Sequence, residues 1–120
     1  MFDAIEKLRF ILESIIIIEE RMQAINQEKD FINSKDGLTI LDAITMRLQA
    51  IGDSFSQIKK KNQKLLEEQL QIDVDPIIGF RNFISHHYEL LDYQIIYKIC
   101  TKDLPPLKKS IENYLNNLHN

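Results

Sequence analysis

The sequence of 120 residues contains one cysteine, no tryptophan, three glycines and three prolines. With Cys100 as the single cysteine, no intrachain disulfide and no cysteine-rich metal site can form, which fits a reducing compartment. So few glycines and prolines provide few chain breaks, and the many Ile, Leu, Lys, Glu and Gln residues favour long helices over a β fold with many turns. We therefore expect an all-α protein.

Long apolar runs are also missing. The longest one covers residues 15–18 and is far too short to cross a bilayer. Acidic residues stand near the start, where a signal peptide would carry positive charge. The length suits a single domain over residues 1–120. We expect a cytoplasmic protein without membrane contact.

Excess positive charge is absent as well. The formal net charge is −3 and the isoelectric point is about 5.6, which argues against broad electrostatic binding of nucleic acid. A local basic site stays possible, because lysines gather at 59–64 and more sparsely at 98–109. For either group alone, a solvated helix face is the favoured interpretation.

The few turn signals divide the chain into helices. Residues 33–37 form a loop, Asp75 is a candidate N-cap with Pro76 at the first helical position, and Asp92 can cap a further helix. Leu104 precedes two prolines and should therefore leave the helical region. We expect helices at about 2–28, 37–71 (with a possible break near 60–62), 76–90, 93–100 and 105–118.

Apolar residues recur every three or four positions in these segments, as helix-on-helix packing requires. With short connections, this pattern predicts an up-and-down helical bundle of four to five helices. Ile16 and Ile17 lie off the main apolar row of the first helix, so that helix is either central or part of a subunit interface. The three rows are Leu8, Ile11, Ile15, Ile18, Met22 and Ile25; Leu41, Ile44, Leu48, Ile51, Phe55 and Ile58; and Leu104, Leu107, Ile111, Tyr114 and Leu118.

Metal and cofactor patterns are weak. His86 and His87 are adjacent and point about a hundred degrees apart on a helix, so they cannot chelate one ion together. The three glycines are scattered and form no phosphate-binding loop. Cys100 lies in an apolar stretch and is expected in the core. We expect no metal site and no cofactor.

Residues 81–88, Arg-Asn-Phe-Ile-Ser-His-His-Tyr, hold most of the candidate chemistry. On a helix, Arg81, Ser85 and Tyr88 share one face, and Asn82 and His86 share an adjacent face. Arg81 and His86 lie about 140° apart around an ideal helix. They can meet at one substrate only if the helix is distorted or a second subunit brings its own copy.

This residue set suits cleavage of RNA. Histidine titrates near neutrality and can move the proton of a 2′-hydroxyl or of the leaving 5′-oxygen. Arginine presents a fork that matches two phosphate oxygens and neutralises growing charge. Asn82 and Tyr88 can orient the substrate or the histidine. A structural interpretation stays open, and the apolar row makes His87 the better candidate for a buried structural role. That row is Phe80, Ile84, His87 and Leu91.

Three segments together resemble a known family. Arg81-x4-His86-x-Tyr88, with Asn82 after the arginine, is similar to the signature of HEPN-domain proteins, and most closely to the HepT-like toxins. Residues 47–53 resemble that family's Arg-Leu-x-x-Ile-Gly-Glu segment, and residues 103–107 resemble its Asp-Leu-Pro-x-Leu helix start. The chain departs from the family in having Asp53 where glutamate is usual, and in lacking the tryptophan often found before the motif.

The resemblance implies a dimeric HEPN-like bundle whose two motifs face each other across a cleft. It implies a metal-independent endoribonuclease toxin that restrains growth, with Arg81 and His86 catalytic and Asn82 and Tyr88 supporting. Ser85, on the Arg81 face, is a further supporting candidate. It also implies an antitoxin, a minimal nucleotidyltransferase of the MNT type, that transfers AMP to Tyr88. A phosphate ester there would place negative charge beside Arg81 and repel RNA.

Two other functions stay open. Some HEPN-type domains pair with nucleotidyltransferases as non-catalytic binding or scaffold subunits, and the acidic isoelectric point and Asp53 are compatible with that role. The remaining alternative is a purely structural bundle, in which the polar residues of 81–88 have no chemical task.

Overall fold

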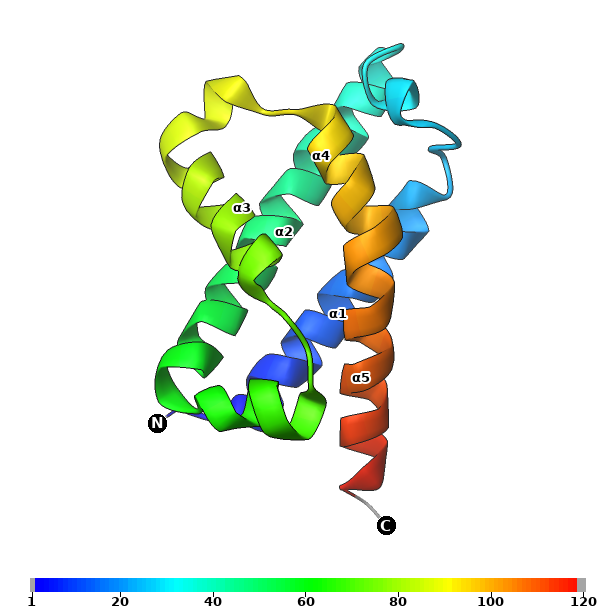
Figure 1. Cartoon of the computed structure of the whole chain (residues 1–120). Coiled ribbons are helices and arrows are strands. Elements are labelled where there is room, and N and C mark those ends of the chain that lie inside the picture. Colours follow the sequence, from blue (N-terminus) through cyan, green and yellow to red (C-terminus); the bar gives the residue numbers. More distant parts are fainter. Residues whose placement is uncertain (1, 119–120) are drawn as a thin grey trace.

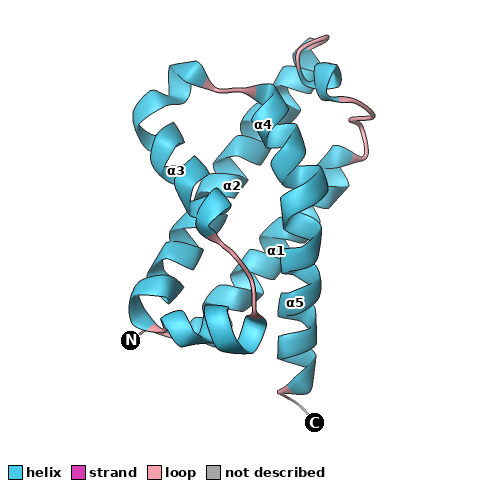
Figure 2. Ribbon diagram, viewed as in Figure 1, coloured by secondary structure: helices cyan, strands magenta, loops and turns pink. Residues whose placement is uncertain are grey.

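The computed structural model describes residues 2–118, which form an all-α bundle with no strand in that part of the chain (Figures 1 and 2). This confirms the predicted fold class. Its α-helices are α1 (Ala4–Met22), α2 (Lys35–Lys61), α3 (Asp75–His87), α4 (Tyr93–Lys98) and α5 (Leu104–Asn117). None of the helices in the described residues combines the length and apolar character needed to cross a membrane.

Three pairwise packings of helices organise the bundle. The helices α1 and α2 cross and pack on each other, α3 packs on α2, and α5 packs on α1. The helix α3 therefore lies along α2 on the left of Figure 1, and α5 lies along α1 on the right. The first two predicted apolar rows lie in the core, except that Met22 is half-buried. On α5 the buried row continues through Leu115, while Leu118 is exposed.

The first helix is not enclosed on all sides. Ile16 is 38% exposed and Ile17 is half-buried, whereas Leu8, Ile11 and Ile15 are fully buried. One face of α1 therefore meets solvent in the protomer, and the alternative of a central helix is wrong. The subunit-interface alternative stays a prediction.

Capping side chains fix several helix starts. Asp3 accepts a hydrogen bond from the Glu6 amide, and Ser34 accepts one from the Gly37 amide at 2.9 Å. Asp92 accepts one from the Gln94 amide, which confirms its predicted role.

The prediction for Asp75 is wrong, because Val74 is the N-cap residue and Asp75 is already helical. The Asp75 carboxylate instead binds the Lys59 ammonium at 2.8 Å. An ion pair to another helix has thus replaced the expected local cap.

The predicted break before the two prolines is also wrong. Leu104 keeps helical backbone angles, and the chain is helical from Tyr93 through Asn117. A wide π turn, Ile99–Asp103, precedes α5, and the Leu104 amide bonds back to the Ile99 carbonyl. Pro105 and Pro106 stand in the first turn of α5, where their missing N–H groups cost little.

Other helix ends differ from the prediction because local bonds end or tighten the helices. The first helix stops at Met22, six residues before the predicted end, and a 3-10 turn follows at Glu28–Phe31. The Asp30 carboxylate accepts the amides of Asn26 and Gln27 there, so these amides are not available to extend the helix. The long second segment does break near residue 62, and a π-helical stretch, Leu65–Leu70, follows.

Candidate active site

The site lies where α3 runs along α2, and polar contacts tie the two helices together at both ends. At the start of α3, Asp75 pairs with Lys59 near the end of α2. After the end of α3, the Tyr88 hydroxyl donates a hydrogen bond to the Asp42 carboxylate at 3.1 Å. The order of these contacts makes the helices antiparallel and fixes the register of residues 81–88 against α2.

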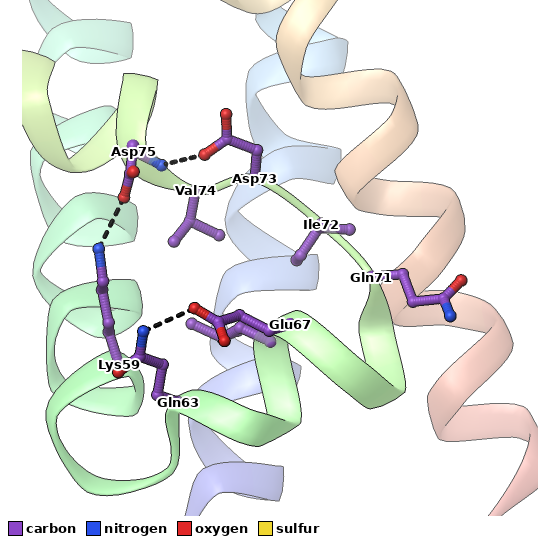
Figure 3. Close-up of a pocket in the computed structure, with 9 residues that line it drawn as sticks. Lys59, Gln63, Glu67, Gln71, Ile72, Asp73, Val74 and Asp75 are labelled. Atoms are coloured by element: carbon purple, nitrogen blue, oxygen red, sulfur yellow. Dashed lines mark hydrogen bonds and ion pairs between the residues drawn. The ribbon is translucent and has the colours of Figure 1, made fainter.

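The Lys59–Asp75 end borders a hollow of about 450 Å³, shown in Figure 3. The Asp73 carboxylate accepts a hydrogen bond from the Asp75 amide, and the Gln63 side chain donates one to Glu67 (Figure 3). Most of the polar groups that line the hollow therefore bond to one another. None of the predicted site residues lines this hollow. The Lys59–Asp75 ion pair at this hollow anchors the start of α3 on α2.

Between the two ends, Asp53 of α2 holds Arg81 of α3. The Asp53 carboxylate lies 2.5 Å from Arg81 Nε, and Arg81 Nη1 donates to the Asn82 side-chain oxygen at 3.1 Å. Both side chains of the ion pair keep a third to a half of their surface exposed, so water screens it and its net stabilisation is below about 1 kcal/mol. Its main effect is to orient the guanidinium, whose other N–H groups stay available for a phosphate.

Gly52 lets the two helices approach at Arg81. A Cβ added at this position would lie 2.6 Å from Arg81 Cβ and 3.2 Å from the Ile77 carbonyl oxygen. No real Cβ contact is as short as the first of these, so any larger residue would push α3 away from α2. Sequence reasoning noted residues 47–53 only as a family resemblance, and the structure shows what Gly52 and Asp53 contact.

Asp42 was missed by sequence reasoning. It is exposed on α2, about two turns after that helix begins at Lys35, and its partner Tyr88 is 46 positions away along the chain. No local pattern marks such a contact. Partial burial, followed by the hydrogen bond to Asp42, raises the pKa of the Tyr88 hydroxyl, which therefore stays protonated at neutral pH.

The histidines occupy the exposed last turn of α3. The helix is regular from Asp75 to His87, so Arg81 and His86 do not share a face in one protomer. The predicted burial of His87 is wrong: Phe80 and Ile84 are buried, but His87 is exposed and packs against Phe83 with ring centroids 4.9 Å apart. His87 is the last residue of α3, and the buried row stops at Ile84, about one turn earlier.

Ser85 bonds within its own helix. Its hydroxyl donates to the Arg81 carbonyl oxygen at 2.6 Å, a common arrangement for serine in a helix. The structure thus places Arg81 and Tyr88 in contact with α2, and leaves His86 exposed. Asn82 and Ser85 both bond to Arg81.

The remaining sequence candidates have structural surroundings. Cys100 packs against the core, and burial raises the pKa of its thiol to about 12. Lys98 pairs with Asp103 and Lys108 with Glu19, so parts of the second lysine group lie in surface ion pairs. Within residues 2–118, no three His, Cys, Asp or Glu side chains gather as a metal site would require.

Comparison with known proteins decides the family. A family model described as ribonuclease HepT-like matches residues 11–114. The chain belongs to the HepT-like ribonuclease family. This HepT-like match includes all three segments on which the sequence resemblance rested, at residues 47–53, 81–88 and 103–107, and confirms it.

Two curated relatives of this HepT-like chain agree. "Putative RNase MJ1380" of Methanocaldococcus jannaschii is 31% identical over 102 residues, which cover 85% of this chain and 87% of the relative. "Putative RNase TTE0752" of Caldanaerobacter subterraneus subsp. tengcongensis is 28% identical over 108 residues, covering 90% of each. No solved structure matches the chain.

Proposed function

We propose that this HepT-like protein is a metal-independent endoribonuclease in which Arg81 and His86 are the catalytic residues. The observation that supports it most is the placement of Arg81. Gly52 permits its close approach to α2, and the Asp53 carboxylate holds its Nε. A guanidinium fixed at the surface in this way can bind a phosphodiester and stabilise the charge that develops on it.

The reaction we propose uses the 2′-hydroxyl of RNA as the nucleophile. Its oxygen bonds to phosphorus while the bond from phosphorus to the 5′-oxygen breaks. One His86 takes the proton of the 2′-hydroxyl, and a protonated His86 gives a proton to the leaving 5′-oxygen. The products are a 2′,3′-cyclic phosphate and a 5′-hydroxyl, and no metal ion or further reactant enters the balance.

The shape of α3 supports a homodimer as the active form. Because the helix is regular through His87, Arg81 and His86 of one protomer point in different directions. A second copy facing the first would place both pairs around one RNA strand in a shared cleft. It would also supply the two histidines that the two proton transfers need.

We further propose that the protein is the cytoplasmic toxin of a toxin–antitoxin pair, inhibited by a nucleotidyltransferase antitoxin that transfers AMP to Tyr88. The Tyr88 hydroxyl would bond to the α-phosphorus of ATP, releasing pyrophosphate and its proton. The half-exposed side chain supports access to this hydroxyl. The new phosphate would break the bond to Asp42 and repel an RNA backbone at the site.

Incubation of the purified protein with total RNA and tRNA in excess EDTA tests the activity, read on a denaturing gel. We expect cleavage by the wild type and none by His86→Ala. Asn113→Ala, at an exposed position of α5, is the matched control and should cleave normally. Cyclic-phosphate ends on the products would identify the 2′-hydroxyl as nucleophile.

The result that would overturn the proposal is intact RNA with every variant, or full cleavage by folded His86→Ala. Intact RNA together with tight binding of a nucleotidyltransferase would support the alternative, a non-catalytic HEPN binding or scaffold subunit. Incubation of that partner with labelled ATP and either wild type or Tyr88→Phe then tests the modification. Label on the tyrosine variant would contradict the choice of Tyr88.

A further inference from the structure

An exposed aromatic pair lies on α3 beside the proposed catalytic histidine. Phe83 is 47% exposed, although it is a large apolar side chain that gains from burial. Its ring packs against the exposed His87 imidazole at an interplanar angle of 37° and a centroid distance of 4.9 Å. The proposed reaction uses neither ring.

Phe83 also forms one wall of a small groove between α3 and α4. Phe80 and Phe83 line it from α3, and Ile95 and Ile99 line it from α4 and the turn that follows. Ile95 is itself 49% exposed. The cavity volume is about 200 Å³. That is smaller than the roughly 300–1,000 Å³ of drug-sized ligand sites, and suits one planar ring system.

One edge of the groove is polar, because Lys98 and Asp103 both line it and pair with each other. Lys98 lines the groove, and its ammonium group lies 3.1 Å from Asp103 with 59% of its side chain exposed. This ammonium has three N–H donors and bonds to both oxygens of the Asp103 carboxylate, so at least one donor is left for a phosphate next to a base in the groove.

Helix geometry places the groove next to the reacting position. Phe83 and His86 are three residues apart on α3 and are therefore neighbours on its surface. Phe83 lies on the side of His86 away from Arg81, because the order around the helix is Arg81, His86, Phe83. A strand whose phosphate lies at His86 in the shared cleft would carry an adjoining nucleotide over Phe83.

We propose that Phe83 is a base-stacking residue and that the groove between α3 and α4 receives one unpaired nucleobase of the RNA substrate. Single-stranded RNA is commonly bound through unstacked bases that pack on aromatic side chains. The inference rests on the proposed ribonuclease function and adds a binding position to it. It also predicts that unpaired RNA is cleaved in preference to duplex.

Binding is measured with a single-stranded oligoadenylate that contains 2-aminopurine, whose fluorescence falls when the base stacks. The protein carries His86→Ala so that the RNA stays intact. The His86→Ala protein is the parent, and we expect it to quench the fluorescence. When Phe83→Leu is added to the parent, we expect the quenching to be lost and Kd to increase at least about 5-fold. Phe83→Trp should retain both, since it keeps an aromatic face.

The matched control is Phe10→Leu, because Phe10 is a similarly exposed phenylalanine on α1. It should bind as the parent does. In the wild-type background, Phe83→Leu should raise KM with little change in kcat, because stacking binds the ground state and the transition state alike. Urea unfolding of each variant checks that the effect is not a loss of folding.

The outcomes separate this inference from the proposed function. If the wild type cleaves RNA while Phe83→Leu shows the same quenching, Kd and KM as its parent, the stacking role is wrong and the ribonuclease proposal stands. If the wild type neither binds nor cleaves RNA, both are wrong. Equal losses in Phe83→Leu and Phe83→Trp would also contradict stacking, since the aromatic face would not matter.

Discussion

Asp53 on α2 forms an ion pair with Arg81 on α3, and this pair joins two segments that the sequence resemblance had marked separately. The carboxylate binds Nε, the nitrogen nearest the aliphatic part of the arginine. Of the terminal nitrogens, Nη1 donates to the side-chain oxygen of Asn82. Asp53 acts on the site through the orientation of Arg81.

Asp53→Asn should lower kcat by about tenfold, which corresponds to about 1.4 kcal/mol of transition-state stabilisation. The amide cannot hold the guanidinium as the charged carboxylate does. The free energy of unfolding should change by less than about 1 kcal/mol, because the pair is partly solvated. RNA cleavage kinetics and urea unfolding measure the two quantities.

Two further variants make this test specific. Asp53→Glu keeps the charge and should retain most of the activity, as expected for a positioning residue. Asp75→Asn breaks another ion pair between α2 and α3, at the hollow that none of residues 81–88 lines, and should leave kcat nearly unchanged. Equal losses for Asp53→Asn and Asp75→Asn would mean that the ion pairs only hold the helices together.

Gly52→Ala and Gly79→Ala form a matched pair with opposite expected effects. At Gly52 the new methyl would meet Arg81 Cβ at 2.6 Å, so α3 must shift, at a cost of about 1–3 kcal/mol in stability and with a loss of activity. At Gly79 nothing lies within 4 Å of the added Cβ, and alanine should stabilise α3 by about 0.5–1 kcal/mol. Urea unfolding measures the stability of both variants. A Gly52→Ala protein as stable and active as the wild type would contradict the close approach of α3 to α2 at Gly52.

Much of the fold was predictable because helical periodicity is a repeated signal. The rows on the first two helices identified the core between α1 and α2. Single-residue rules did less well where a tertiary contact competed with a local preference. Asp75 binds Lys59 instead of capping its own helix, and Leu104 stays helical because a π turn changes the hydrogen-bond register before the prolines.

The candidate site was predictable only as a segment. Sequence reasoning identified residues 81–88 from their composition and family resemblance, and it recognised that Arg81 and His86 diverge on a regular helix. It could not identify Asp42, because a contact between distant parts of the chain leaves no local pattern. It misplaced His87, because the apolar row was continued to this last residue of α3, where the side chain is exposed.

Cys100 gives a pH-dependent test of the core. Burial raises the pKa of its thiol from 9.0 to about 12, so the folded protein should hold about a thousandth of the thiolate of the unfolded chain near neutral pH. Since Cys100 is the single cysteine, a disulfide reagent such as DTNB reports on it alone. We expect reaction at least about a hundredfold slower in the native protein than in urea.

The same shift determines the sign of a stability change. The folded state favours the neutral thiol, so its stabilising contribution is complete below pH 9 and is lost as the pH rises toward about 12. The stability of the wild type relative to Cys100→Ala should therefore fall by about 1–2 kcal/mol between about pH 9 and pH 10.5. A difference that stays constant with pH would place the thiol in contact with water.

The dimer proposal predicts that activity depends on protein concentration. If Arg81 and His86 from two protomers complete one site, a separated protomer cannot cleave, since its own regular α3 holds the two side chains apart. Specific activity should then fall on dilution below the dimer Kd, in parallel with the dimer fraction measured by light scattering or mass photometry. Added His86→Ala should inhibit the wild type by forming mixed dimers, whereas added bovine albumin should not. Constant specific activity across the range in which the dimer dissociates would mean that one protomer holds a complete site, and the shared cleft would have to be abandoned.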